Sequence, residues 1–231
     1  MLKRCATWLV ALCIVAQSSG VRASEACAGG VVALTFDDGP APATSALLDI
    51  LAREGLRVTF FVLGKHVEQY PDLARRIVAD GHAIANHSYT HPDLTTLPGS
   101  EIESELRRTQ QVVLKVTGKK VVFARPPYGE SNDQVRHQLS TAGLKEVIWT
   151  VDSLDWTGVG AKEILRGVEM TQPGGVVLMH DTSPQLREAL PLIAKHFRDN
   201  RICAGKLAPT TKRMPVGNWY PRAFYVHAER W

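Results

Sequence analysis

Short apolar segments rich in β-branched residues alternate along the chain with longer segments of helical periodicity. The apolar segments predict strands at residues 31–36, 58–63, 82–85, 121–124, 146–151 and 175–179. The helical pattern predicts helices at residues 43–54, 71–80, 100–117, 132–142, 161–171 and 185–198. This alternation favours a parallel sheet covered by helices, either open or closed into a barrel. Because no repeat or linker divides residues 24–200, we expect them to form one α/β domain.

The first 23 residues have the pattern of a secretory signal peptide. Lys3 and Arg4 precede an apolar stretch at 5–16, which is too short to span a bilayer as a helix. The segment Val21-Arg22-Ala23 resembles an Ala-x-Ala cleavage site. We therefore expect residues 1–23 to be removed and the protein to be secreted or periplasmic, with an uncleaved N-terminal anchor as the alternative.

Removal of this peptide lowers the net charge. The chain has 27 basic and 23 acidic residues, and Lys3, Arg4 and Arg22 lie in the peptide, which leaves 24 basic residues against 23 acidic ones. Nucleic-acid binding requires a strongly basic face. The charge therefore gives no support to a nucleic-acid partner.

Two of the four cysteines, Cys27 and Cys203, lie outside the predicted peptide. An exported protein folds in an oxidising compartment, so we expect these two to form a disulfide between the start of the first strand and the end of the last long helix. The alternative is two unrelated small apolar side chains.

Residues 201–231 have a different composition, because prolines interrupt them and aromatic side chains gather there. We expect a C-terminal tail that packs on the catalytic domain of residues 24–200. The alternative is that the tail forms an aromatic edge of a sugar-binding groove. Its aromatic residues are Trp219, Tyr220, Phe224, Tyr225 and Trp231.

Two adjacent carboxylates, Asp37 and Asp38, follow the first predicted strand and precede Gly39-Pro40. Neighbouring carboxylates beside a core repel each other and lose hydration, so we expect a metal ion or an arginine close to them. Sheets of parallel strands carry their sites at the carboxyl ends of the strands, which is where this pair lies.

A second polar cluster, Asn86-His87-Ser88-Tyr89-Thr90-His91-Pro92, follows the third predicted strand. His87 and His91 are four residues apart, so we expect them on one helical turn with their imidazoles on the same side. Two imidazoles and one carboxylate are a suitable ligand set for Zn²⁺. The histidine spacing alone is weak evidence, and the neighbouring Asp-Asp pair strengthens it.

Arg125-Pro126-Pro127-Tyr128-Gly129 follows the fourth strand. An arginine at a strand end can pair with a carboxylate and keep it ionised. The two prolines stiffen the backbone, so that the N–H of Tyr128 can point at a developing oxyanion. The alternative is a stiff turn with a surface arginine.

Asp155 and His180 lie in the last two clusters, Asp152-Ser153-Leu154-Asp155-Trp156 and Leu178-Met179-His180-Asp181. An Asp155–His180 pair would stabilise the imidazolium and raise its pKa, which suits a general acid near neutral pH. A histidine at a strand end can also be structural.

The motifs TFDDG, HSYTHP, RPPYG, DSLDW and LMHD occur in the order and spacing of the polysaccharide deacetylase family (carbohydrate esterase family 4), which the chain resembles over about residues 30–200. The resemblance implies a distorted (β/α) barrel with incomplete closure and mostly parallel strands. It also implies a divalent metal, usually Zn²⁺, held by Asp38, His87 and His91.

The resemblance further implies that Asp37 is the general base toward a metal-bound water and that Arg125 is its partner. His180 resembles the general acid that protonates the departing amine, tuned by Asp155.

The remaining resemblances concern substrate contacts. The backbone N–H of Tyr128 resembles an oxyanion donor, and Trp156 and Leu178 resemble the apolar walls around the acetyl methyl group. We therefore expect a monomeric enzyme that removes N-acetyl groups from an acetylated amino-sugar glycan, peptidoglycan or chitin-type, without stable membrane insertion after signal cleavage. An O-acetyl esterase acting on xylan is the alternative. A glycan-binding module on an inactive barrel would show a broken motif, and all five motifs are intact.

Overall fold

The computed structural model describes residues 27–207 and 226–227. The predicted signal peptide and the aromatic residues of the tail lie outside the described residues. Within the described part, no helix is both long and apolar enough to cross a membrane.

Strands and helices alternate as the sequence predicts. The strands are β1 (Val31–Asp37), β2 (Thr59–Val62), β3 (Ala83–Asn86), β4 (Phe123–Ala124), β5 (Lys145–Glu146), β6 (Val151–Asp152), β7 (Val176–His180), β8 (Cys203–Leu207) and β9 (Val226–His227). The helices are α2 (Thr44–Arg53), α3 (Gly64–Gln69), α4 (Pro71–Ala79), α5 (Gly99–Thr117), α6 (Asp133–Thr141), α7 (Ala161–Glu169) and α8 (Pro184–Asp199). Short 3-10 turns lie at Leu94–Thr96, Pro127–Gly129 and Asp155–Thr157.

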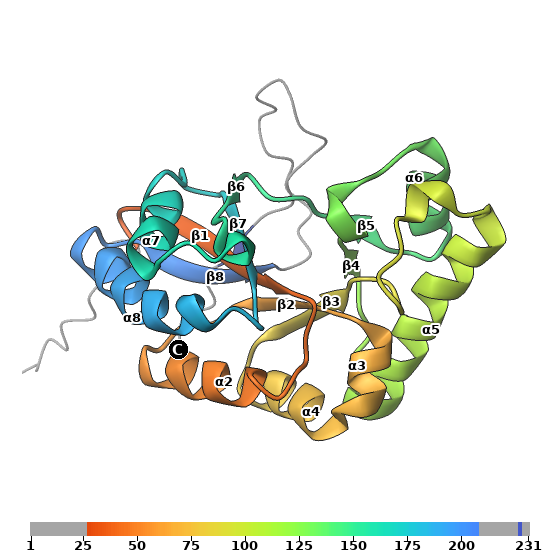
Figure 1. Ribbon diagram of the computed structural model, residues 1–231, viewed down its shortest axis with the longest axis horizontal. Coiled ribbons are helices and arrows are strands. Elements are labelled where there is room, and N and C mark those ends of the chain that lie inside the picture. The colour runs from red at the N-terminus through yellow and green to blue at the C-terminus, as the bar shows by residue number, and fades with distance from the viewer. Residues whose placement is uncertain (1–26, 208–225, 228–231) are drawn as a thin grey trace, which may run out of the picture.

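The strands form a curved sheet in the order β5-β4-β3-β2-β1-β7-β6, with β8 also paired to β1. All pairings are parallel except the one between β8 and β9. The helices surround this sheet, with α2 and α4 below it, α7 and α8 on one side and α5 and α6 on the other (Figure 1). The predicted distorted (β/α) barrel is therefore confirmed.

The barrel is incomplete at residues 145–152. The first part of this segment, β5, pairs with β4, and its last part, β6, pairs with β7. Backbone hydrogen bonds show where the segment changes from β4 to β7. The N–H of Val147 donates to the backbone oxygen of Ala124, and the N–H of Thr150 donates to that of Val176. The single strand predicted at 146–151 is thus two short strands, because the segment changes partner as it crosses the opening.

Alternation along β1 separates the two hydrophobic layers. Val32, Leu34 and Phe36 pack in the outer core between sheet and helices, whereas Ala33 packs in the inner cluster within the barrel. Successive side chains of a strand point to opposite faces. The last residue of β1, Asp37, has the parity of Ala33 and is therefore directed into the barrel.

Helix α3 and strands β8 and β9 were not predicted. Helix α3 is short and begins at Gly64, so its helical pattern is weak. Strand β8 lies in the segment assigned to the tail, and its sequence Cys-Ala-Gly-Lys-Leu has no clear strand pattern. Backbone pairing with β1 defines it, together with the expected disulfide between Cys27 and Cys203, whose Cα atoms are 5.3 Å apart.

Candidate metal and acid–base site

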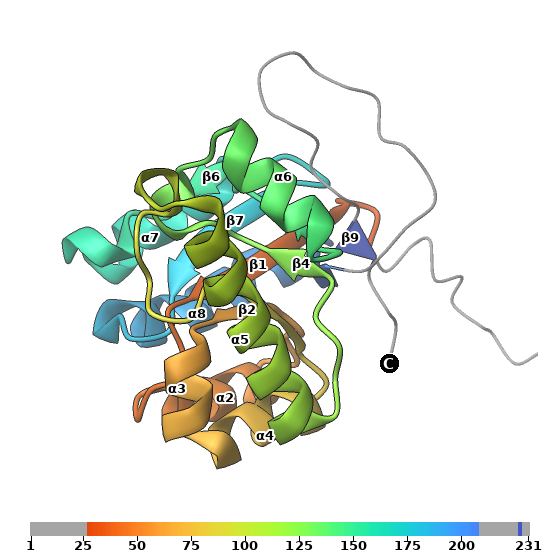
Figure 2. The same cartoon turned by 90° about the vertical axis from the view of Figure 1, so that its right-hand side faces the viewer.

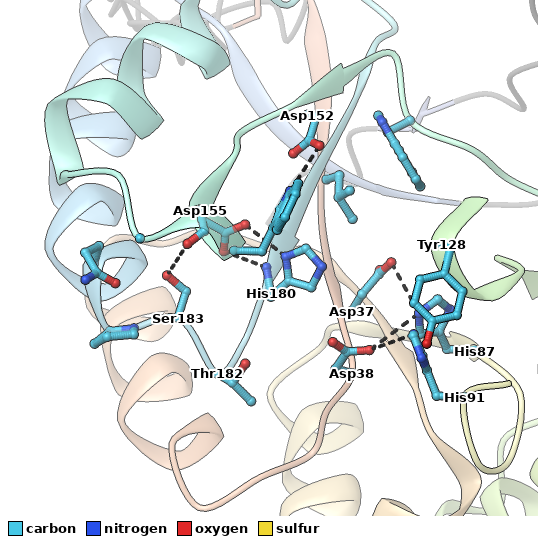
Figure 3. A pocket seen from close by; sticks show the side chains of 16 residues that line it. Asp37, Asp38, His87, His91, Tyr128, Asp152, Asp155, His180, Thr182 and Ser183 are labelled. Atoms are coloured by element: carbon cyan, nitrogen blue, oxygen red, sulfur yellow. Dashed lines mark hydrogen bonds and ion pairs between the residues drawn. The ribbon is translucent and has the colours of Figure 1, made fainter. Parts of the chain in front are cut away.

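The carboxyl ends of the central strands surround one pocket of about 760 Å³. It is lined by residues of all five motifs, and Figure 3 shows their side chains converging from opposite walls. His87 and His91 lie on one side, His180 and Asp155 lie on the other, and Asp37 and Asp38 lie between them. The structure thus brings together every site residue predicted from the sequence except Arg125, which lies beneath the pocket, and the two cysteines of the disulfide.

Asp38, His87 and His91 form a cluster suited to a metal ion. The Oδ1 atom of Asp38 is 3.5 Å from Nε2 of His87 and 3.4 Å from Nε2 of His91. This Oδ1 atom is buried and has no hydrogen-bond partner among the described residues. A buried carboxylate oxygen is normally paired. One carboxylate and two imidazoles facing one point fit a divalent cation such as Zn²⁺.

His87 is held as a metal ligand should be. Its Nδ1 atom donates a hydrogen bond to the backbone oxygen of Arg125 at 2.7 Å, which leaves the lone pair on Nε2. Burial lowers the pKa of His87 to about 3, against a smaller opposing effect of Asp38. His87 is therefore neutral and able to donate its lone pair to a cation.

The expectation that His87 and His91 share a helical turn is wrong. Ser88 and His91 both have left-handed backbones, with φ of 67° and 70°. The side chain of Asn86 accepts from the N–H of Ser88 at 2.8 Å, and the Ser88 hydroxyl accepts from that of His91 at 3.0 Å. These side-chain bonds replace helical ones, so the two imidazoles converge through a tight turn.

The buried Asp37–Arg125 pair lies beside the metal cluster. The Nη1 atom of Arg125 donates to Asp37 at 2.7 Å and to the Thr35 hydroxyl at 3.0 Å. Its Nε atom donates to the backbone oxygen of Val147 at 3.1 Å. Burial raises the pKa of Asp37, and the charge of Arg125 opposes this rise. The predicted contact is confirmed, and the two opposing effects favour a carboxylate that can accept a proton.

On the other side of the pocket, His180 pairs with Asp155. The Nδ1 atom of His180 donates to Asp155 at 2.9 Å, and the other carboxylate oxygen accepts from the backbone N–H of His180 at 2.8 Å. Burial by itself lowers the pKa of His180, but the hydrogen bond and negative charge of Asp155 outweigh burial and raise it. His180 on β7 is the register neighbour of Asp37 on β1. The imidazole beside Asp155 and the carboxylate beside Arg125 therefore face the same pocket.

Aromatic side chains form the rim of the pocket. Trp156 is 63% exposed, and its indole N–H donates to Asp152 at 3.2 Å. Tyr128 is 64% exposed, and its ring lies edge-on to that of His91 with centroids 4.7 Å apart. Leu178 contributes to the buried floor, and Trp149, which was not predicted, also lines the pocket.

Asp181 and His66 support the site without having been assigned a role. Asp181 is buried and accepts a 2.5 Å hydrogen bond from Thr44, and burial raises its pKa to about 7. A Cβ atom at Gly39 would lie 2.0 Å from the Asp181 carboxylate, so this position requires glycine. The Nδ1 atom of His66 donates to the backbone oxygen of Asp38 at 2.7 Å. The final letter of the LMHD motif indicated Asp181, whereas no pattern distinguished His66.

A barrel whose strand ends carry a pocket with paired carboxylate and imidazole side chains beside a possible metal site is an arrangement typical of hydrolases. Residues 25–147 match the polysaccharide deacetylase family. A chitooligosaccharide deacetylase of Rhizobium leguminosarum bv. trifolii is 42% identical over 153 residues, which cover 65% of this chain and 71% of the relative. A bifunctional xylanase/xylan deacetylase of Cellvibrio japonicus is 37% identical over 186 residues, which cover 80% of this chain and 28% of the relative.

A solved structure has the same fold. The family 4 carbohydrate esterase from Streptomyces lividans in complex with acetate superimposes with a TM-score of 0.77 at 42% identity, over 79% of this chain and 95% of that chain. The chain therefore belongs to the polysaccharide deacetylase family, carbohydrate esterase family 4.

Proposed function

We propose that this protein is a Zn²⁺-dependent deacetylase that removes N-acetyl groups from an exported amino-sugar glycan, chitin-type or peptidoglycan. The observation that carries the proposal is that Asp37 beside Arg125 and His180 beside Asp155 face one pocket. The cluster of Asp38, His87 and His91 lines the same pocket. The name of the Rhizobium relative supports an amino-sugar substrate.

Asp38, His87 and His91 would hold the metal, which when bound polarises the acetyl carbonyl and lowers the pKa of water. Asp37 takes a proton from the attacking water, whose oxygen forms a bond to the carbonyl carbon. Arg125 keeps the Asp37 carboxylate ionised and in place. The predicted oxyanion donor is the N–H of Tyr128, whose left-handed backbone follows two prolines.

His180 supplies the second proton. Breaking the C–N bond expels an amine, which is a poor leaving group unless its nitrogen is protonated. The Nε2 atom of His180 gives its proton to that nitrogen while Asp155 stabilises the charge on the ring. Leu178 and Trp156 then offer apolar contacts to the acetyl methyl group. The products are acetate and a glucosamine-type residue.

Three variants test these roles on N-acetylglucosamine oligomers. Asp37→Asn should lower kcat by about a hundredfold or more while Zn²⁺ binding persists. Asp38→Ala should lose Zn²⁺ itself. The control Asp72→Asn removes an exposed carboxylate on α4 and should change neither. Near-normal turnover by Asp37→Asn would refute its role as the base.

The role of His180 has a separate test, because activated esters release a good leaving group that needs no proton. His180→Ala should reduce amide hydrolysis far more than hydrolysis of an activated acetate ester. Equal losses on both substrates would contradict a leaving-group role.

The second candidate is O-acetyl ester hydrolysis on xylan. The name of the Cellvibrio relative favours it. Acetate release measured side by side from N-acetylglucosamine oligomers, peptidoglycan fragments and acetylated xylan separates the two candidates. Release from xylan alone would replace the proposed substrate class.

A further inference from the structure

The tight turn at Ser88–His91, here called the His91 turn, presents one of the three candidate metal ligands. Its two left-handed residues, Ser88 and His91, are not glycines. Side-chain-bearing residues hold such a backbone only where their surroundings determine it. The position of the His91 imidazole therefore depends on the contacts that fix this turn from outside.

Helix α3 fixes the carbonyl side of the turn. The N–H of Gly64 donates to the backbone oxygen of Ser88 at 3.1 Å, and the N–H of Lys65 donates to that of Tyr89 at 3.1 Å. These are N–H groups of the first helical turn, which have no partner within the helix. Helix α5 packs against α3 (Figure 2).

A single side chain of α5, Glu105, fixes the N–H side. Its Oε2 atom accepts from the backbone N–H groups of Tyr89 and Thr90, each at 2.7 Å. Its Oε1 atom accepts from the Thr90 hydroxyl at 2.8 Å. Short bonds to an ionised acceptor are the strong kind. Three of them converge on the two residues just before His91.

The other imidazole of the cluster does not depend on Glu105. His87 directly follows β3, its backbone N–H donates to Val62, and its ring is held by the backbone oxygen of Arg125. Loss of the Glu105 contacts would therefore loosen the turn that carries His91 and leave His87 in place.

We propose that Glu105 is a positioning residue that holds the His91 turn so that the His91 imidazole faces the metal site. This role rests on the metal site of the proposed function. Glu105 does not line the pocket, and it acts through its hydrogen bonds to Tyr89 and Thr90.

The test measures Zn²⁺ affinity of the metal-free protein by competition with a chelator. Glu105→Ala should weaken Zn²⁺ binding by about tenfold or more, as loss of groups that orient a ligand typically does. Glu105→Gln should restore most of the affinity, because its amide oxygen can still accept from both N–H groups. The matched control is Glu103→Gln, an exposed residue of α5 that pairs with Arg107, and it should bind as the unaltered protein does.

A double-mutant cycle separates positioning from general stability. If Glu105 acts through His91, Glu105→Ala should cost almost no further affinity once His91 is alanine. An equal loss in both backgrounds would overturn the role, and so would wild-type affinity of Glu105→Ala. Should that variant fail to fold, Thr90→Val removes one of the three bonds without altering α5, and unchanged affinity there would also overturn it. Absence of Zn²⁺ binding by the unaltered protein would instead overturn the proposed metal site, and this role with it.

Discussion

The buried pair of Asp37 and Arg125 allows the sharpest test of how the site is held together. Both side chains are almost completely buried, at 3% and 0% exposure. Arg125→Met keeps the volume but leaves Asp37 without its counter-charge. Breaking a buried pair from one side costs about 3–5 kcal/mol. For a domain of this size, each kcal/mol corresponds to about 2–4 °C in Tm, so we expect a loss of roughly 6–20 °C.

The cost should depend on pH. Burial already raises the pKa of Asp37, and Arg125 opposes that rise. Removing Arg125 raises the pKa further, so the carboxyl can escape the penalty by binding a proton as the pH falls. The destabilisation should be largest near pH 8 and smaller near pH 5, and the acidic limb of the pH–rate profile should move to higher pH.

Urea unfolding of a double-mutant cycle measures the pair directly. Asp37→Asn alone leaves the buried guanidinium without a counter-charge, whereas the double variant removes both charges. The double variant should be more stable than the sum of the two losses predicts, by about 2 kcal/mol or more. If the loss in free energy of unfolding of the double variant equals the sum of the two single losses to within about 0.5 kcal/mol, the inference that the two charges stabilise each other is refuted.

Three further predictions concern stability. Burial lowers the pKa of His82 to about 4 from 6.5, so the stability contributed by its neutral form is present above pH 6.5 and is lost as the pH falls toward 4, by up to about 3 kcal/mol. In urea unfolding, His82→Asn should make the free energy of unfolding depend less on pH, and the exposed control His137→Gln should leave this dependence unchanged. The same pH dependence for His82→Asn and the unaltered protein would contradict the prediction. Burial raises the pKa of Asp181 to about 7 from 3.8, so its protonated form favours folding and that stability is lost as the pH rises from about 4 to about 7. Asp181→Asn, which keeps an acceptor for Thr44, should be more stable than the unaltered metal-free protein at pH 8, and a lower Tm there would argue against a strained carboxylate. The disulfide closes a loop with a sequence separation of 176, so replacing both Cys27 and Cys203 by alanine should lower the free energy of unfolding by about 5 kcal/mol. An unfolding midpoint of the unaltered protein that does not change under reducing conditions would show that the disulfide does not contribute to stability.

The sequence predicted the elements that carry chemistry because they end in unusual residues. An apolar strand followed by Asp-Asp, by His or by Arg-Pro-Pro leaves a clear signal, and β1, β3, β4 and β7 all have one. The pairing of β8 left no such signal, since its strand is defined by neighbours distant in the sequence. The role of Glu105 also left no signal in the sequence. A glutamate on the polar side of a helix pattern is common, and only the packing of α5 beside the His91 turn brings Glu105 to Tyr89 and Thr90.

Backbone conformation explains why both carboxylates of the Asp-Asp pair reach the same pocket. In a continuing strand, Asp37 would face the barrel and Asp38 would face the helices. The chain instead turns at Asp38, whose φ of 77° is left-handed, and both side chains line the pocket. His66 holds the backbone oxygen of Asp38, and the glycine that follows lets Asp181 approach from the other side. Adjacent carboxylates can therefore have different partners, His87 and His91 for Asp38 and Arg125 for Asp37, because the strand ends between them.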